Sequence, residues 1–465
     1  MQQAYDVLVV GAGTAGLFFA RKMADQGYSV LVADKLPEER QGERLGVFHI
    51  DQERFALHCV PEPRPGDEDY IGRFDYGITK SAFDHYPKRA DYPFLLLRFA
   101  PFLKRLRAWA AEAGVDFAFG AQFLSFLRGQ RSGRIAGALL RQGGEDVQVR
   151  ARLVADCSGI PSAARRKLKG SRVEAFDITP RDMFYVVLHY AKLKHPEKDR
   201  VSFPTGYAQY KAWIGQTEDP DGCLFGIGAN LSHDYADLCY QRFRAAIQVP
   251  EHEYLRTERG VTPYRRGPYS MADGGFICMG DAACMNKPFS GEGMTAGWVG
   301  CALAAEVAGK AMRNGAYPTE AALWEYSRRY ARTQGADFAG LFAMLASAVD
   351  CTAEENEYEF EKDIVFTSRQ LTRTNRTFSG AMPAGEALQL GVKAAAGVLT
   401  GKISLNSAKN LSRGVVFSAL LQAHYRAFPE TPAGFEAWAA KCDRLWARCG
   451  NIADVTEKCE MRNNT

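Results

Sequence analysis

The sequence predicts an α/β fold in which a domain built on a parallel sheet is interrupted by a β-rich insert and followed by a helical region. The chain opens with two apolar runs that flank a glycine-rich turn and an amphipathic segment, at residues 5–35. Residues 172–268 hold short aromatic and β-branched runs separated by turn sequences such as TEDPDG. From about residue 315 onwards, apolar residues recur at i, i+3, i+4 and i+7, which is typical of amphipathic helices.

The composition of the 465 residues is that of an ordinary globular protein, with 46% hydrophobic and 24% charged residues. A formal net charge of +4 is small for this length and argues against a nucleic-acid partner. Because no run of about 18 apolar residues occurs, we expect no transmembrane helix. The N-terminus lacks a signal-peptide pattern, so we expect a cytoplasmic location. The eleven cysteines form no CxxC pair, which favours reduced thiols over a disulfide framework or a metal site.

The first turn, GAGTAG, has the spacing of a dinucleotide-binding turn. Val7–Val10 predicts a buried strand, LFFARKMADQG predicts a helix, and SVLVAD predicts a second strand that ends at Asp34. Gly11 allows the tight turn, Gly13 lets the backbone approach a pyrophosphate, and Gly16 lets helix and strand pack closely. The helix N-terminus would face the phosphates, and Asp34 would accept hydrogen bonds from a ribose 2′-hydroxyl. We therefore expect bound NAD or FAD, and not NADP.

Two further motifs lie far downstream. Residues 151–168, ARLVADCSGIPSAARRKL, predict a strand followed by a turn that contains Gly159. Residues 274–312 contain a strand ending in Gly280-Asp281-Ala282, a loop with Pro288, the turn Gly291-Glu292-Gly293-Met294 and a long helix of small residues. With these three motifs in this order, roughly the first 330 residues resemble the FAD-dependent oxidoreductases of the aromatic-hydroxylase and geranylgeranyl-reductase group.

The resemblance implies that the bound dinucleotide is FAD. Asp281 can hydrogen-bond the ribityl chain, and the turn at 291–294 opens a helix whose positive end favours the reduced flavin. The resemblance also implies a contact from Arg98, which follows FLLL and leads into an amphipathic helix ending at Gly114. The candidate cofactor-binding residues are Gly11, Gly13, Thr14, Ala15, Gly16, Asp34, Lys35, Arg44, Arg98, Gly159, Asp281, Pro288, Gly291, Gly293 and Met294.

In folds of this group the FAD-binding domain is discontinuous. We expect its first part over residues 1–171, a substrate domain with a mixed β-sheet over 172–268, and its completing part over 269–330. A helical C-terminal region follows over 331–465. The predicted fold class is α/β, namely a Rossmann-type FAD-binding domain with an inserted β-rich substrate domain and a helical C-terminal region.

Finer residues favour a reductase over a hydroxylase. Cys284 stands where many aromatic hydroxylases have the histidine of GDAAH, and SGEGM is closer to the GEG of geranylgeranyl reductases. The match is partial, because Trp213 is followed by Ile214-Gly215-Gln216 and not by a Phe-Pro-Lys run. The leading prediction is hydride transfer from reduced flavin to a carbon–carbon double bond of an apolar, isoprenoid- or lipid-like substrate. The alternatives are an FAD monooxygenase that hydroxylates an aromatic or polyketide-like substrate with NAD(P)H and O2, and a non-catalytic flavoprotein that serves as a redox module.

The flavin itself is the expected reagent, so the side-chain candidates are secondary. The candidates for catalysis are His49, Cys284 and Tyr207, each with a plain structural role as its alternative. The aromatic candidates for the substrate site are Tyr207, Tyr210, Trp213 and Phe289, which could equally be core residues.

The partners follow from the same motifs. Because no second GxGxxG occurs, a nicotinamide donor such as NAD(P)H would dock transiently, and another electron carrier is equally compatible. The charged run SRQLTRTNRTF at 368–378 is a solvated face, or a contact for an anionic lipid head or a pyridine nucleotide phosphate. A small apolar or aromatic substrate is expected. The sequence leaves open whether the apolar C-terminal helices contact a membrane peripherally or a second subunit.

Overall fold

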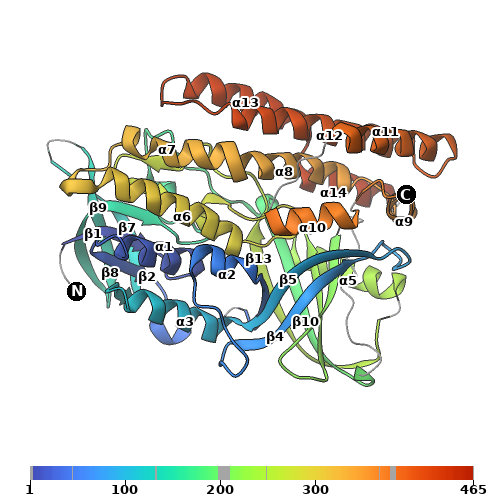
Figure 1. The fold of residues 1–465 in the computed structure, drawn as a ribbon, viewed down its shortest axis with the longest axis horizontal. Coiled ribbons are helices and arrows are strands. Elements are labelled where there is room, and N and C mark those ends of the chain that lie inside the picture. Colours follow the sequence, from blue (N-terminus) through green and yellow to red (C-terminus); the bar gives the residue numbers. More distant parts are fainter. Residues whose placement is uncertain are drawn as a thin grey trace.

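The computed structural model describes residues 4–43, 45–130, 133–196, 210–247, 249–365, 367–377 and 384–463. It has three β-sheets, with helices packed on the largest sheet and gathered again in the C-terminal part of the chain (Figure 1). The predicted α/β class with a Rossmann-type first domain and a helical C-terminal region is confirmed.

The largest sheet has eight strands, and the glycine-rich turn lies at the edge where its parallel strands end. Its main order is β14-β15-β9-β1-β2-β6, and β7 and β8 extend it through β9. The four pairings β15–β9, β9–β1, β1–β2 and β2–β6 are parallel, so the carboxyl ends of these strands meet at one edge. The strands are β1 (Ala4–Val10), β2 (Val30–Asp34), β6 (Asp116–Phe119), β7 (Ala121–Arg128), β8 (Ile135–Gln142), β9 (Glu145–Asp156), β14 (Ala272–Asp273) and β15 (Phe276–Cys278).

Three helices pack on this sheet, as the sequence predicts: α1 (Thr14–Ala24), α3 (Phe99–Ala111) and α6 (Met294–Ala311). Their shared core holds Phe18 stacked on Trp298 with ring centroids 5.5 Å apart, and Phe102 beside Trp298. The indole N–H of Trp298 donates to the backbone oxygen of Thr14 at 3.3 Å. The small-residue helix α6 therefore lies directly against α1, although about 280 residues separate them.

The insert forms a four-stranded antiparallel sheet in the order β11-β12-β10-β13. The strands expected from DMFYVVLHYAKL, AQYKAWIG and CLFGIGANL are present as β10 (Met183–Leu193), β11 (Tyr210–Gln216) and β12 (Gly222–Ala229). Two further elements were not predicted from the sequence, namely β13 (His252–Pro263) and the helix α5 (His233–Ala246), which covers one face of the sheet. The predicted insert at 172–268 encloses all five elements.

A small third sheet, which the sequence analysis also missed, lies between the two larger ones. It has three antiparallel strands in the order β3-β5-β4, namely β3 (Val47–Asp51), β4 (Tyr70–Thr79) and β5 (Lys88–Arg98), with a short helix α2 (Glu53–His58) after β3. It is formed from residues that the sequence analysis assigns to the first part of the FAD-binding domain.

The C-terminal region is helical, as predicted. The helix α7 (Glu320–Tyr330) continues through a π-helical turn at Ala331–Gly335 into α8 (Ala336–Ala348). The helices α9 (Ala353–Glu361), α10 (Ser368–Thr377), α11 (Ala384–Leu399), α12 (Leu405–Arg426), α13 (Phe435–Cys449) and α14 (Ile452–Asn463) follow. In Figure 1, α11, α12 and α13 form an outer layer along the top of the molecule, above α7 and α8.

None of the helices among the described residues is long and apolar enough to cross a membrane. None of the eleven cysteines forms a disulfide; Cys59 is exposed and the other ten are buried. Within the described ranges, no three His, Cys, Asp or Glu side chains are grouped as metal ligands would be.

Candidate functional site

The glycine-rich turn after β1 is built by close packing around an open space. Gly11 has φ +110°, and a Cβ there would overlap the carbonyl of Cys157; a Cβ on Gly16 would overlap the carbonyl of Gly11. Beside Gly13, by contrast, a Cβ would meet no atom within 4 Å. Two glycines are thus required by packing, and the middle one borders unfilled space at the start of α1. No side chain caps this helix, so its first N–H groups are available to an anion.

Asp34 holds this turn through the backbone. Its carboxylate accepts hydrogen bonds from the N–H groups of Ala12 at 2.7 Å and Leu36 at 2.8 Å. The carboxylate therefore lies beside the glycine turn, where the sequence predicts the ribose contact, and each of its oxygens already accepts one bond. Lys35 is exposed next to it.

The second motif is joined to the first and third motifs by hydrogen bonds. The buried carboxylate of Asp156 accepts bonds from the N–H groups of Ser158, Ala164 and Arg165, which shapes the turn containing Gly159. The guanidinium of Arg165, itself fully buried, donates to the carbonyl of Ala282 at 2.8 Å. The three motifs therefore meet at one edge of the sheet.

The third motif lies against α1. The strand ends at Cys278, slightly earlier than predicted, and Gly280–Ala283 forms a 3-10 turn. A Cβ on Gly280 would lie 2.8 Å from the Cβ of Ala15, so the turn and helix α1 are in close contact. The carboxylate of Asp281 accepts a bond from the side-chain amide of Asn286 at 3.2 Å, and burial raises its pKa.

These residues fit a dinucleotide such as FAD. Helix α6 starts after Gly293 without a side-chain cap, as α1 does after Gly13, so two helix N-termini offer N–H groups to anionic parts of a ligand. Next to α6, the side-chain oxygens of Asn286 and Ser290 are buried and have no hydrogen-bond partner among the described residues. Buried polar atoms are normally satisfied, so these two are suited to accept or donate bonds to a bound ligand.

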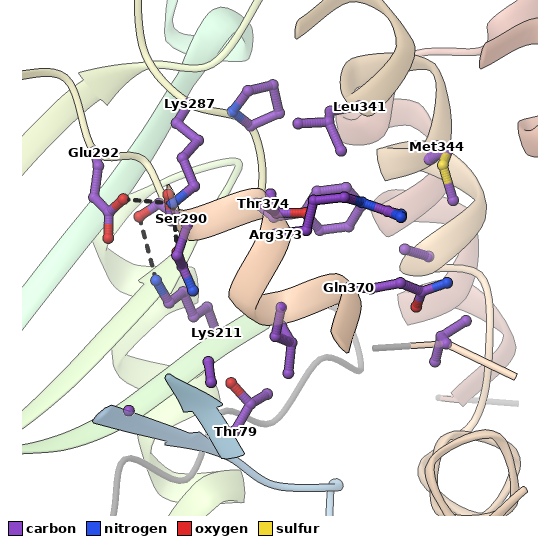
Figure 2. A pocket seen from close by; sticks show the side chains of 18 of the residues that line it. Thr79, Lys211, Lys287, Ser290, Glu292, Leu341, Met344, Gln370, Arg373 and Thr374 are labelled. Atoms are coloured by element: carbon purple, nitrogen blue, oxygen red, sulfur yellow. Dashed lines mark hydrogen bonds and ion pairs between the residues drawn. The ribbon is translucent and has the colours of Figure 1, made fainter. Parts of the chain in front are cut away.

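A cavity of about 260 Å³ lies next to the loop that precedes α6 (Figure 2). The loop, the three-stranded sheet, β11 and helices α8 to α12 all contribute to its wall. Its lining residues include His49, Thr79, Tyr92, Phe94, Lys211, Trp213, Lys287, Pro288, Phe289, Ser290, Glu292, Leu341, Met344, Ala348, Glu359, Ile364, Gln370, Arg373, Thr374, Asn375, Leu390, Leu411 and Gly414.

One end of the cavity carries a cluster of charges. Glu292 accepts a bond from the ammonium of Lys287 at 2.7 Å and lies 3.1 Å from Nε2 of His49. Burial alone would raise the pKa of Glu292, but Lys287, His49 and Lys211 together hold it well below its usual range. The ammonium of Lys287 also donates to Asn375 of α10 at 2.6 Å, so this ion pair joins the loop to a C-terminal helix.

Lys211 on β11 has an unusual environment for a lysine. Its ammonium donates to the carbonyl of Ser290 at 3.2 Å and lies 5.5 Å from the ring centroid of Trp213. Burial lowers the pKa of Lys211 to about 8; the nearby Glu292 opposes this shift and Lys287 adds to it. In Figure 2, Lys211, Ser290, Glu292 and Lys287 gather on one side of the cavity. An amine with such a pKa can both hold and release a proton near neutral pH.

The other end of the cavity is mainly apolar and is formed by C-terminal helices, although Gln370 and Arg373 of α10 also line the cavity. Figure 2 places Leu341 and Met344 of α8 away from the charged cluster, and Ile364, Leu390 and Leu411 complete this wall. Glu359 also lines the cavity, but burial and the nearby Glu355 raise its pKa to about 8, so it is mostly neutral at pH 7. The cavity thus combines a charged end with a mainly apolar end.

The cavity gathers His49, Trp213, Pro288 and Phe289 from the sequence-predicted site residues. Tyr210 instead lines a second cavity of about 30 Å³. Other predicted site residues do not line this cavity. The side chain of Arg98 pairs with Glu218 at 2.7 Å and donates to the carbonyl of Glu68, at the start of α3. Cys284 is buried, and burial raises the pKa of its thiol to about 12. Tyr207 and Arg44 lie outside the described residues.

Lys211, Lys287 and Glu359 line the cavity but were not predicted as site residues from the sequence. A lysine within the otherwise apolar and aromatic run YKAWIG was a usable signal, since lysine is rarely buried without a reason. Lys287 and Glu359 carry no such signal, because their burial depends on helices far away in the sequence.

Comparison with known proteins agrees with this geometry. Two family models described as FAD binding domain match residues 6–42 and 94–218. The digeranylgeranylglycerophospholipid reductase of Methanocella arvoryzae is 26% identical over 315 residues, which is 63% of this chain and 74% of the relative. Digeranylgeranylglycerophospholipid reductase 2 of Methanococcoides burtonii is 24% identical over 388 residues, 80% of this chain and 91% of the relative.

Solved structures show the same fold. A geranylgeranyl bacteriochlorophyll reductase-like protein from Thermoplasma acidophilum superposes with a TM-score of 0.63 at 18% identity, covering 89% of this chain and 99% of that one. The flavin-dependent brominase Bmp2 superposes with a TM-score of 0.64 at 15% identity, covering 86% and 99%. Since one fold hosts several flavin chemistries, the superpositions alone do not select a reaction.

The fold, the three converging motifs and the matched domains define the class: the chain is an FAD-dependent oxidoreductase, and FAD is its cofactor. Within this class it is related to the geranylgeranyl-reductase-like proteins, so the resemblance stated from the sequence is confirmed.

Proposed function

We propose that the protein is a reductase that saturates a carbon–carbon double bond of an apolar, isoprenoid- or lipid-like substrate. The observation that carries the proposal is the cavity, which extends from the loop preceding α6 to an apolar wall made by α8, α11 and α12. The apolar residues of this wall are suited to contact a hydrocarbon chain. Relatives of similar sequence are named as reductases of a digeranylgeranyl lipid, which supports the same substrate class.

The cofactor would be held by the turn after β1, Asp34, the turn after β9 and the segment from Asp281 to Met294. When bound and reduced, FAD supplies a hydride. The chain's own residues then have three tasks, namely to orient the alkene, to exclude water and to provide a proton. Trp213, Pro288 and Phe289 line the cavity next to the charged cluster and are suited to the first two tasks.

The proton is proposed to come from Nζ of Lys211, which holds a proton at pH 7 and releases it more readily than an ordinary lysine. His49 is a second candidate, since its Nε2 lies beside Glu292 at the same end of the cavity. Cys284 is a poorer donor, because burial raises the pKa of its thiol to about 12.

The remaining partners belong to the same proposal. We propose a nicotinamide such as NAD(P)H as the electron donor. The one GxGxxG turn in the sequence is assigned to FAD, so the nicotinamide would dock transiently. We also propose peripheral contact with a membrane.

The rival candidate function is that of an FAD monooxygenase, which would need O2 for turnover, whereas the reductase would not.

The decisive experiment reduces the purified holoenzyme chemically under strict anaerobiosis and supplies a detergent-dispersed isoprenoid alkene. We expect flavin reoxidation together with a product that has gained two hydrogen atoms per double bond, detected by mass spectrometry. Product that forms only with O2 and contains added oxygen would establish the monooxygenase instead. In a parallel sample, Gly13→Ala places a methyl group in the open space beside the turn and should lose flavin, whereas Gly260→Ala, which also meets no atom within 4 Å, should retain it.

A further inference from the structure

Helix α11 exposes an apolar face to the outside of the molecule. Leu388, Val392 and Leu399 are 72%, 63% and 87% exposed, and they recur at helical spacing on one side. Ala395 and Ala396, also exposed, lie between them. The opposite side of the same helix carries Leu390 and Ala394, which are buried. Apolar residues therefore cover both sides of α11, whereas a surface helix normally has one polar side.

The exposed apolar face continues onto α12. Leu405, Val416 and Leu420 are 77%, 53% and 46% exposed. Six of the thirteen large hydrophobic residues that are exposed in the described part of the chain thus lie on these two helices, and the other seven are spread over five elements. Both helices belong to the outer layer at the top of Figure 1. We call these six residues the α11–α12 face. Exposed apolar residues gathered on two neighbouring helices in this way indicate an interaction surface.

The charges on the two helices favour a partner with a negatively charged surface. Residues 384–426 contain five basic residues, Lys393, Lys402, Lys409, Arg413 and Arg426, and one acidic residue, Glu386. Glu386 faces inwards and pairs with Arg373 at 3.5 Å. Lys402 and Lys409 are exposed at the turn between α11 and α12 and at the first turns of α12, next to Leu399 and Leu405. An apolar face bordered by lysines is the pattern of a helix that lies in the surface of an anionic bilayer.

A second copy of the chain fits this face less well. A twofold interface brings the same surface patch of both copies together, so the lysines at the border would approach other lysines. No acidic patch lies on the two helices to compensate, since Glu386 is their one carboxylate. Like charges in contact weaken an interface, whereas anionic lipid heads would neutralise them.

The two helices that carry the α11–α12 face also form part of the cavity wall. Leu390 of α11 and Leu411 of α12 line the apolar end of the cavity, while Leu388 and Leu405 of the same helices face outwards. One layer of helix, roughly 10 Å thick, therefore separates the cavity from the exposed face.

We propose that the α11–α12 face docks on the surface of an anionic membrane. This inference rests on the proposed function, because a membrane is where a lipid-like substrate resides. Docking would place the helical wall of the cavity against the bilayer, so that an apolar chain could move between them without exposure to water. The docking surface itself involves only the two helices and needs no turnover.

The test measures binding of the full-length, FAD-loaded protein to sedimented vesicles of phosphatidylglycerol and phosphatidylcholine, without substrate. We expect Leu388→Glu and Val392→Glu each to weaken binding by about tenfold or more, since each replaces a membrane-facing apolar side chain by a charge. Leu57→Glu is the matched control, because Leu57 is 63% exposed, as Val392 is, but lies on α2. Its binding should equal that of the unaltered protein. Vesicles of phosphatidylcholine alone should bind all forms more weakly.

Three results would overturn the proposal: no binding to anionic vesicles, equal binding by the Leu388→Glu and control variants, or a stable dimer in solution that Leu388→Glu dissociates. The readout is separable from the reductase activity. A protein that binds vesicles through this face but reduces no alkene contradicts the proposed function alone. If the protein reduces a detergent-dispersed alkene but does not bind anionic vesicles, the proposed docking is wrong and the proposed function stands.

Discussion

At the scale of single residues, the most informative side chain is Lys211. Its ammonium is held between the carbonyl of Ser290 and the face of Trp213, at the charged end of the cavity. Burial lowers its pKa to about 8, although the neighbouring Glu292 favours the charged form. A proton donor works best when its pKa lies close to the working pH, so this shift suits the role proposed for it.

Replacing Lys211 by Met should leave flavin binding intact and lower the rate of alkene reduction by roughly 10²-fold or more, since general acids contribute on that order. In the unaltered protein, the rate should fall as the pH rises through about 8, because the donor is then deprotonated. This fall should be absent in Lys211→Met. Stopped-flow reoxidation of the reduced flavin between pH 6 and pH 9.5, roughly, measures both effects.

The control for this prediction is Lys192→Met on strand β10 of the same sheet. Lys192 is half exposed and lies 3.9 Å from Asp221, so its loss should change neither the rate nor the pH profile. An unchanged pH profile in Lys211→Met would assign the proton to another group, with His49 as the next candidate.

Residues of the cofactor site were predictable because their chemistry depends on local sequence. Gly16 is required by its contact with Gly11 within the turn, and Asp281 comes shortly after the end of its strand. The burial of Lys287 was not predictable, because it depends on segments that meet only in the folded chain. For Lys211 the one signal was its apolar and aromatic neighbours in the sequence. The loop that contains Ser290 encloses Lys211, and α10 supplies the partner of Lys287.

At the scale of helices, the cavity wall depends on the close packing of α8 against α12. A Cβ on Gly340 would overlap the side chain of Gln422, and a Cβ on Gly414 would lie 2.5 Å from Oγ of Ser347. Both Gly414 and Ser347 line the cavity. The two glycines therefore set the distance between the helices and, with it, the width of the apolar end.

Gly414→Val should force α8 and α12 apart and lower the free energy of unfolding by about 1–3 kcal/mol, as is usual for overpacked interiors. It should also raise KM for a long alkene, because the added side chain enters the cavity. The comparison variant is Gly391→Ala on α11, where a Cβ meets no atom within 4 Å. There the free energy of unfolding should rise by about 0.5–1 kcal/mol, since alanine favours helix. Urea titrations followed by fluorescence measure both changes, and equal effects of the two substitutions would contradict this view of the wall.

The strands with a clear apolar run were predicted, whereas β13, which has no pattern, and α5, which has one, were missed. The strands β1, β2, β10, β11 and β12 stand out as apolar runs. Strand β13 is an edge strand whose residues are mostly exposed, so HEYLRTERGVTP shows no alternation. Helix α5 did carry a signal, because its buried residues, from Tyr235 to Phe243, recur at helical spacing.

At the scale of the whole molecule, the last helix returns to the insert. The carboxylate of Glu460 on α14 accepts two hydrogen bonds from Arg242 of α5, at 2.6 and 2.7 Å, and one from the hydroxyl of Tyr235. Nearby, the buried amide of Asn230 donates to Thr456 at 2.9 Å. The C-terminal region is thereby tied to the β-rich insert, and the cavity between them is enclosed. No local pattern could have predicted this contact, since its partners are more than 200 residues apart.

Glu460→Gln should lower the free energy of unfolding by about 1–1.5 kcal/mol, the usual difference between charged and neutral hydrogen bonds. The hydrogen bonds from Arg242 hold the pKa of Glu460 below the ordinary 4.5. Its contribution is therefore fully present above about pH 4.5 and is lost as the pH falls through the lowered pKa, so the gap between the two proteins should shrink on acidification. Glu457→Gln is the control: Glu457 pairs with Arg181 on the exposed surface and should matter little. If Glu457→Gln destabilises the protein as much as Glu460→Gln does at pH 7, the buried contact of α14 with the insert is not what joins the two regions.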